Sequence, residues 1–142
     1  MITKQEIERT VIDWLKTYED LSDIPFYNTL DTTEIKPVCI IVNGENIAPT
    51  DGFAVADSRE KQMQITVSLM FDFYNENGKV YKENLIRTLG ETLTDVSDYL
   101  DFVNDDETIE FYVYALILED ETDETDGTNY LYNFQMNLIA RW

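Results

Sequence analysis

The most regular alternation of apolar and polar positions in this 142-residue chain lies between residues 61 and 74. The apolar residues occupy the odd positions and are Met63, Ile65, Val67, Leu69, Phe71 and Phe73. The even positions, apart from Met70 and Tyr74, are polar and mostly uncharged: Gln62, Gln64, Thr66, Ser68 and Asp72. Because successive side chains of a strand point to opposite faces, this pattern predicts a long strand with one apolar and one polar face.

A second alternating segment lies at the C-terminus, between residues 130 and 142. Its apolar residues occupy even positions and are Tyr130, Tyr132, Phe134, Met136, Leu138, Ala140 and Trp142. Its polar residues lie between them and are Asn133, Gln135, Asn137 and Arg141. Two long strands of this kind predict a mainly antiparallel sheet, with one face covered and the other open to water or to a partner.

Apolar residues at helical spacing predict two helices. Thr3 and Glu6 have the spacing of a capping box, and a helix is expected from about residue 4 to residue 18. The residues expected on its wet side are Lys4, Glu8, Arg9, Asp13 and Lys16. A second helix of about twenty residues is expected from the stripe formed by Tyr81, Leu85, Leu89, Leu93, Val96, Leu100 and Val103. It is long enough to cover the apolar face of the 61–74 strand.

Three shorter segments complete the predicted sheet. Residues 25–30 fit a short strand or an extended connection, and residues 38–42 fit a strand buried on both faces. Asn43-Gly44 offers a turn at the end of that strand. Residues 109–118, rich in aromatic and β-branched side chains, fit a strand near the middle of the sheet or beneath a neighbouring subunit.

Two long loops are predicted. One spans about residues 45–61 and is either a long excursion between strands or a loose hairpin around Asp51-Gly52. It serves either as a solvent loop or as an arm that contacts a partner. The other is an acidic hairpin loop at about residues 119–129. The whole chain, residues 1–142, is thus predicted to be a single α+β domain: a mainly antiparallel sheet with an N-terminal helix and one long helix packed on one face.

The charge balance limits the classes of partner. The chain has 29 acidic and 10 basic residues, and its net charge is -19. Such a surface repels phosphate backbones, so tight nucleic-acid binding is not expected. The charge suits high solubility, a basic protein partner, or a surface that DNA must pass without adhering. No apolar run reaches a membrane-spanning length of about 20 residues, and the N-terminus lacks a signal-peptide pattern, so synthesis in the cytoplasm is expected.

Catalytic and metal-binding chemistry finds little support in the sequence. The chain has no histidine, and its one cysteine, Cys39, lies in an apolar run that predicts a buried, inert thiol. Nucleotide-binding, hydrolase and zinc motifs are absent, so neither an enzyme nor a cofactor is predicted. The acidic loop resembles a calcium loop in composition but not in pattern, because Thr122 and Asn133 take its first and twelfth positions. A solvated acidic loop is the preferred interpretation.

The polar strand faces are more informative. They carry Gln64, Thr66 and Ser68 on one strand, and Asn133, Gln135 and Asn137 on the other. One interpretation is an ordinary wet sheet face, although an acidic protein should then place more charge there. The other is a flat surface used against other subunits or lining a ring.

In its layout the chain resembles the bacteriophage tail-terminator, or tail-completion, proteins. The resemblance rests on a starting helix with Trp14-Leu15, the apolar run at 38–42, the long strand at 63–74, the helix at 81–100 and the closing hairpin that ends at Trp142. It covers essentially the whole chain but includes no diagnostic short motif. Head-tail joining and other neck proteins share much of this layout.

The resemblance implies a structural virion protein of the tail or neck, assembled in the host cytoplasm as a homo-hexameric ring. Such a ring caps the tail tube, stops its polymerisation and contacts a head-side connector or neck protein while DNA passes through. It implies no catalytic residue, cofactor, metal or membrane. The expected subunit or tube contacts are Asp51, Phe53, Arg59, Gln64, Thr66, Ser68, Asn133, Gln135 and Asn137.

The main alternative is an acidic DNA mimic that occupies a DNA-binding enzyme by displaying carboxylates at phosphate-like spacing. It predicts acids arrayed along one face of the molecule. In the sequence the acids are spread through loops and both predicted helices, which favours the virion protein.

Overall fold

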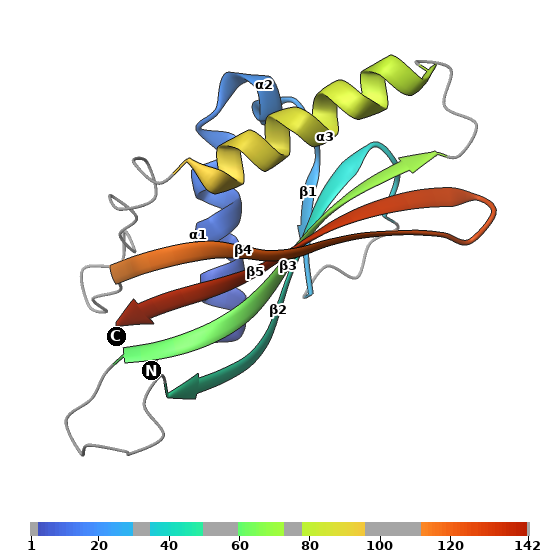
Figure 1. The fold of residues 1–142 in the computed structure, drawn as a ribbon. Helices are drawn as coiled ribbons and strands as arrows, with labels where there is room; N and C mark the ends of the chain where they lie inside the picture. Colours follow the sequence, from blue (N-terminus) through green and yellow to red (C-terminus); the bar gives the residue numbers. More distant parts are fainter. Residues whose placement is uncertain (1–2, 30–34, 50–59, 73–77, 96–111, 142) are drawn as a thin grey trace.

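The computed structural model describes residues 3–29, 35–49, 60–72, 78–95 and 112–141 (Figure 1). Its five strands form one sheet in the order β1-β2-β3-β5-β4. The strands are β1 (Phe26–Asn28), β2 (Cys39–Pro49), β3 (Glu60–Asp72), β4 (Tyr112–Thr125) and β5 (Asn129–Arg141). β1 runs parallel to β2 and the other pairs are antiparallel. The predicted fold class, α+β with a mainly antiparallel sheet, is confirmed.

β3 and β5 form the continuous centre of the sheet. They pair from Glu60↔Arg141 to Asp72↔Asn129 without a shift of register. This register places odd residues of β3 beside even residues of β5, so the two apolar faces coincide. Ile65 and Met136 are one such pair, and both are buried. The alternation in the sequence therefore predicted which residues form the core floor.

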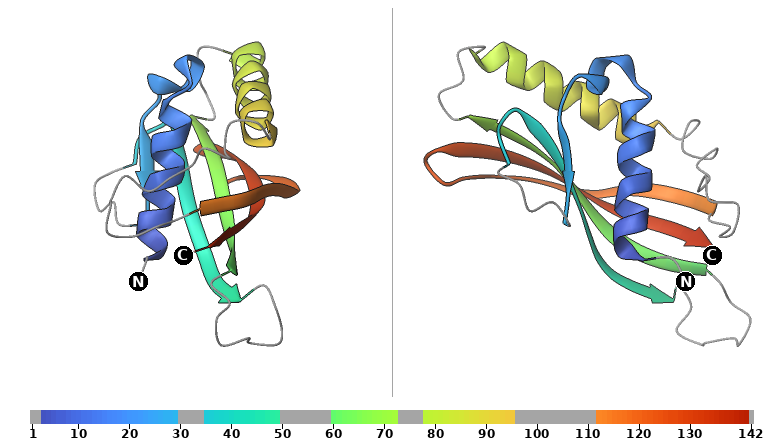
Figure 2. Two further views of the ribbon diagram at one scale, coloured as in Figure 1. Left: turned by 90° about the vertical axis from the view of Figure 1, so that its left-hand side faces the viewer. Right: turned by 180° about the vertical axis from the view of Figure 1, so that it is seen from behind.

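The first helix, α1 (Lys4–Lys16), begins with the predicted capping box. The Thr3 hydroxyl accepts from the Glu6 N–H at 3.2 Å, and the Glu6 carboxylate accepts from the Thr3 N–H at 3.1 Å. α1 packs beside β2, as the two views of Figure 2 show. It ends two residues before the predicted boundary, and a short helix, α2 (Glu19–Ser22), follows where none was predicted.

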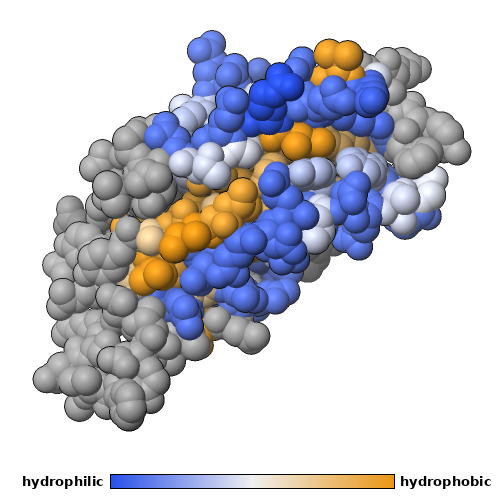
Figure 3. Space-filling view, in the orientation of Figure 1, coloured by the Kyte–Doolittle hydropathy of each residue, from blue (hydrophilic) through white to orange (hydrophobic). Residues whose placement is uncertain are grey.

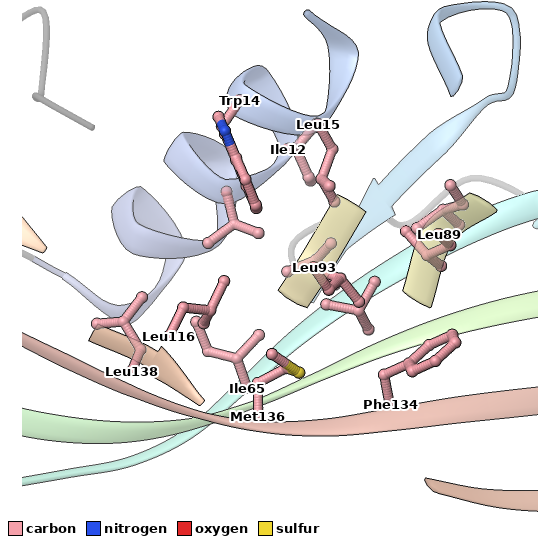
Figure 4. Close-up of a cluster of buried hydrophobic side chains, with 14 of the residues drawn as sticks. Ile12, Trp14, Leu15, Ile65, Leu89, Leu93, Leu116, Phe134, Met136 and Leu138 are labelled. Carbon is pink, nitrogen blue, oxygen red and sulfur yellow. The ribbon is translucent and has the colours of Figure 1, made fainter. Parts of the chain in front are cut away.

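The long helix, α3 (Gly78–Thr94), lies over the apolar face of the sheet (Figures 1 and 4). Leu89 and Leu93 are buried in the same cluster as Phe134. A Cβ atom at Gly90 would lie 3.2 Å from Cε1 of Phe134, so the missing side chain lets the helix approach β5 closely. The prediction also extended this helix to Val103, but residues 96–111 lie outside the described residues.

Glu8 was predicted on the wet side of α1, and this was wrong: its side chain is fully buried. Its carboxylate accepts from the Gly44 N–H at 2.9 Å and from the Thr29 hydroxyl at 2.5 Å. The reason lies in the sheet. The Ile40 N–H donates to the Pro25 carbonyl, on the β1 side of β2. The Gly44 N–H points to the same side, but β1 ends at Asn28 and offers it no carbonyl. Glu8 replaces the missing strand as an acceptor.

The turn predicted at Asn43-Gly44 was also wrong, because β2 continues through it to Pro49. Asn43 pairs with Thr66 and Gly44 with Ile65, so contacts with β3 override the local turn preference. The loop predicted at about 45–61 is correspondingly shorter: both of its ends are strand, and residues 50–59 between them lie outside the described part of the chain.

The last two strands form the predicted hairpin, but the acidic loop predicted at about 119–129 was too long, since β4 runs to Thr125 and only residues 126–128 form the turn. The Tyr130 hydroxyl donates to Asp123 at 2.9 Å, and the Tyr132 hydroxyl donates to Glu121 at 3.1 Å, which joins acidic residues to the neighbouring strand. β4 also lies at the edge of the sheet and not near its middle. Within the described residues, no helix is long and apolar enough to cross a membrane.

Candidate interaction surface

The polar faces of β3 and β5 meet on the side of the sheet opposite the apolar core. The register forms three pairs: Gln64↔Asn137, Thr66↔Gln135 and Ser68↔Asn133. We call these six residues the polar ladder. The structure thus brings together the predicted strand residues. The other predicted contact residues, Asp51, Phe53 and Arg59, lie outside the described residues.

One end of the polar ladder is held by hydrogen bonds that cross three strands. Ser68, only 7% exposed, donates from its hydroxyl to the Asn133 side-chain oxygen at 2.6 Å. The Asn133 amide nitrogen donates to the Thr122 hydroxyl at 3.4 Å and to Glu124 at 3.5 Å. Asn133 is therefore occupied within the sheet. Gln64 and Gln135, both exposed, remain open to a partner on this face.

The neighbouring strands add charge at both sides of the polar ladder. On β2, Glu45 lies opposite Gln64. On β4, Asp120 lies opposite Gln135, while the apolar Ile117, opposite Asn137, is 48% exposed. The surface is therefore a neutral polar centre flanked by acids. The sequence did not show these flanks, because strand pairing decides which residues lie next to the ladder.

A hollow of about 110 Å³ opens on this face. Its lining residues come from all four long strands and are Glu45, Gln64, Ile65, Thr66, Glu119, Gln135 and Met136. The Glu45 and Glu119 carboxylates were not predicted as site residues. Each lies in a segment that the sequence favoured as a loop, so no signal placed them near Gln64 and Gln135.

Burial sets the pKa values of two groups elsewhere in the molecule. Cys39 is buried, as predicted, and burial raises the pKa of its thiol to about 11. Desolvation and the hydrogen bond to Asp123 raise the pKa of Tyr130 to about 12. Among the residues that the structure describes, no group of three or more His, Cys, Asp or Glu side chains is arranged to hold a metal ion.

Comparison with known proteins supports the fold and nothing finer. No family model and no curated protein matches the chain. Among the solved structures that match, one is 13% identical to this chain, with a TM-score of 0.59. The alignment covers 100% of this chain and 98% of that protein, which carries no functional name. The likeness defines the class of the chain as an α+β protein with a mostly antiparallel sheet.

Figure 3 shows a second surface, on the face of the molecule seen in Figure 1. An apolar stripe runs there between polar regions. Of the described residues with exposed large apolar side chains, Val80 and Tyr81 lie on α3, whereas Ile117, opposite Asn137, belongs to the face of the polar ladder.

Proposed function

We propose that this protein is a structural subunit of a bacteriophage tail or neck, with the role of a tail terminator. In that role a homo-hexameric ring caps the tail tube, stops its polymerisation and joins it to the head-side connector. The single observation that carries the proposal is the polar ladder, a row of paired, uncharged side chains at the centre of an otherwise acidic molecule.

Desolvation favours a neutral face as the contact surface. Burying an unpaired carboxylate against another protein costs several kcal/mol, whereas amides and hydroxyls can exchange their water for hydrogen bonds at much lower cost. With a net charge of -19, the chain has few surfaces free of this penalty. The ladder between β3 and β5, each 13 residues long, is such a surface. The ladder occupies positions 64–68 of β3 and 133–137 of β5, so at about 3.4 Å per residue it extends for roughly 14 Å.

The negative charge of the subunits affects both the assembly of the proposed ring and the passage of DNA through it. Like charges on neighbouring subunits oppose ring formation, so assembly should strengthen as salt shortens the electrostatic range to about 8 Å at physiological ionic strength. The same charge keeps a passing phosphate backbone from adhering. The two effects together predict a ring that forms at moderate salt and does not retain DNA.

The test is the mass in solution, measured by light scattering on a sizing column over a range of protein and salt concentrations. We expect a sixfold species that salt stabilises. Gln135→Glu, which adds one charge to the exposed centre of the ladder, should shift assembly to higher protein concentration. Asn84→Asp adds the same charge on the exposed surface of α3 and should leave assembly unchanged.

Two results contradict the proposal. One is a monomer under every condition that also fails to cap purified tail tubes in electron micrographs. The other is an equal effect of Gln135→Glu and Asn84→Asp on assembly, because the ladder would then have no special part in the contact.

The acidic half of β4 favours a second candidate, the DNA mimic. Glu119, Asp120, Glu121, Asp123 and Glu124 are exposed on one extended strand. Because successive side chains alternate faces, acids on one face of the strand repeat about every 6.8 Å, roughly twice the axial spacing of charges on one DNA strand, about 3.4 Å. The candidate therefore rests on the row of acids and not on a matched spacing. This candidate predicts that the protein displaces duplex DNA from a basic DNA-binding enzyme. An enzyme that keeps its DNA at a large excess of this protein rules it out.

A further inference from the structure

The hollow on the polar face is too small for a cofactor. Its volume is about 110 Å³, whereas pockets for drug-sized ligands hold about 300–1,000 Å³. The size fits the head group of one side chain. A ligand that enters it meets side chains from β2, β3, β4 and β5 at once.

Two β-bulges, one in β2 and one in β4, interrupt the strands on either side of the central pair at the level of the hollow. The register of β2 shifts between Glu45 and Ile47, and that of β4 shifts between Leu118 and Asp120. Glu119 is the extra residue of the second bulge. Bulges redirect side chains and recur beside functional sites. Here they accompany one carboxylate on each side of the central amides Gln64 and Gln135.

The polar groups of the hollow are suited to accept hydrogen bonds from a cation. Glu45 and Glu119 supply carboxylate oxygens, Gln64 and Gln135 supply amide oxygens, and Thr66 supplies a hydroxyl. None of the seven lining residues is basic, so the two carboxylates have no counter-ion in the lining of the hollow. A guanidinium group is planar, always charged, and presents five N–H donors to carboxylates on either side.

We propose that this hollow receives the guanidinium group of an arginine from a basic partner protein. The arginine is assigned to a different protein because this chain carries only 10 basic residues against 29 acidic ones, so a second copy has few basic side chains to offer. The inference rests on the proposed use of this face as a protein contact. It adds the chemical identity of the group that enters it.

The test is a titration followed by the backbone amide resonances of the protein. The probe is N-acetyl-arginine amide, and the controls are the lysine analogue and the citrulline analogue, which has nearly the shape of arginine without its charge. We expect arginine to shift the amides of Glu45, Gln64, Glu119 and Gln135 and to saturate there. Citrulline should leave them unchanged.

Matched variants separate the hollow from the general acidity of the surface. Glu45→Gln combined with Glu119→Gln removes two charges with little change of shape, and both residues are exposed. It should weaken arginine binding at least about tenfold, which corresponds to about 1.4 kcal/mol. Asp13→Asn combined with Glu91→Gln removes the same charge from exposed positions on α1 and α3 and should leave the affinity unchanged.

Equal weakening by the two double variants, or shifts spread over all acidic segments, overturns the proposal. So does equal binding of the lysine analogue, because the hollow would then have no preference for a guanidinium. The two proposals can fail separately. If the protein binds arginine but stays monomeric and caps no tail tube, the hollow is supported and the ring is refuted. If it forms the ring but does not bind arginine, only the proposal for the hollow is refuted.

Discussion

The carboxylate of Glu8 on α1 accepts a hydrogen bond of 2.9 Å from the backbone N–H of Gly44 on β2, and the Glu8 side chain is fully buried. The same carboxylate accepts from the hydroxyl of Thr29, just past the end of β1. One side chain therefore joins the first helix to two strands of the sheet. Its removal leaves a buried N–H and a hydroxyl without this acceptor.

We predict that Glu8→Ala lowers the free energy of unfolding by about 3 kcal/mol, because each buried polar group left unsatisfied costs about 1–3 kcal/mol. Glu8→Gln keeps one acceptor oxygen and should lose less. Urea denaturation measures both. Asp13→Ala, on the exposed side of the same helix, serves as the control and should change stability by no more than about 0.5 kcal/mol. If Glu8→Ala lowers the free energy of unfolding no more than the control does, the buried Glu8 hydrogen bonds do not stabilise the fold as predicted.

Gly90 and Phe134 should be energetically coupled. Alanine at an exposed helix position is normally about 1 kcal/mol better than glycine, but a Cβ at Gly90 would lie 3.2 Å from Cε1 of the buried Phe134 ring. We expect Gly90→Ala to gain little or nothing in the wild type. In a Phe134→Leu background, where the ring is gone, the same change should gain about 1 kcal/mol. A double-mutant cycle in urea measures the coupling; additive effects contradict this packing.

The Tyr130 hydroxyl gives the protein a pH dependence at alkaline pH. Desolvation and then Asp123 raise its pKa in the folded state to about 12, from an ordinary value of 10. The folded state thus holds this proton more tightly than the unfolded state. The contribution to stability is complete below pH 10 and is lost as the pH rises toward about 12.

Carbon NMR of labelled tyrosine rings can follow this titration directly. We predict that Asp123→Asn lowers the pKa of Tyr130, because it removes the charge that disfavours the phenolate. Asp120→Asn removes the same charge from a strand residue that lies opposite Gln135, on the polar face, and should move the pKa of Tyr130 less. An equal shift from both variants indicates a general field and refutes the specific contact.

Cys39 should react slowly in the native protein. Its side chain is fully buried, and burial raises the pKa of the thiol to about 11, so little thiolate is present at pH 8. A thiol reagent such as dithionitrobenzoate is expected to modify it only after denaturant is added. Prompt stoichiometric reaction without denaturant contradicts the buried position.

Local sequence patterns correctly predicted the strands in which both partners show the same alternation of apolar and polar residues. Odd apolar residues in β3 and even ones in β5 were enough to define the core face and to place Gln64, Thr66 and Ser68 on the other. The capping box at Thr3 and Glu6 was equally local. These features depend on residues within one element, so the sequence displays them directly.

The errors lie where another strand decides the outcome. Asn43-Gly44 has the composition of a turn but lies inside β2 because β3 supplies its partners. The acidic residues at 119–125 have low strand preference, yet they pair with β5 and two of them accept from tyrosine hydroxyls. The hollow was missed for the same reason: Glu45 and Glu119 are 74 positions apart in the chain and meet only through the strand order.

The two edges of the sheet differ in a way that bears on aggregation. At the β1 edge, the Glu8 carboxylate occupies a backbone donor that a foreign strand could otherwise use. At the β4 edge, a row of exposed acids faces any incoming copy of the same strand with its own negative charge. Edge-to-edge strand pairing between molecules, which leads to fibrils, is favoured where an edge strand is uncovered and carries little charge. The acidic strand therefore protects the protein against aggregation through this edge.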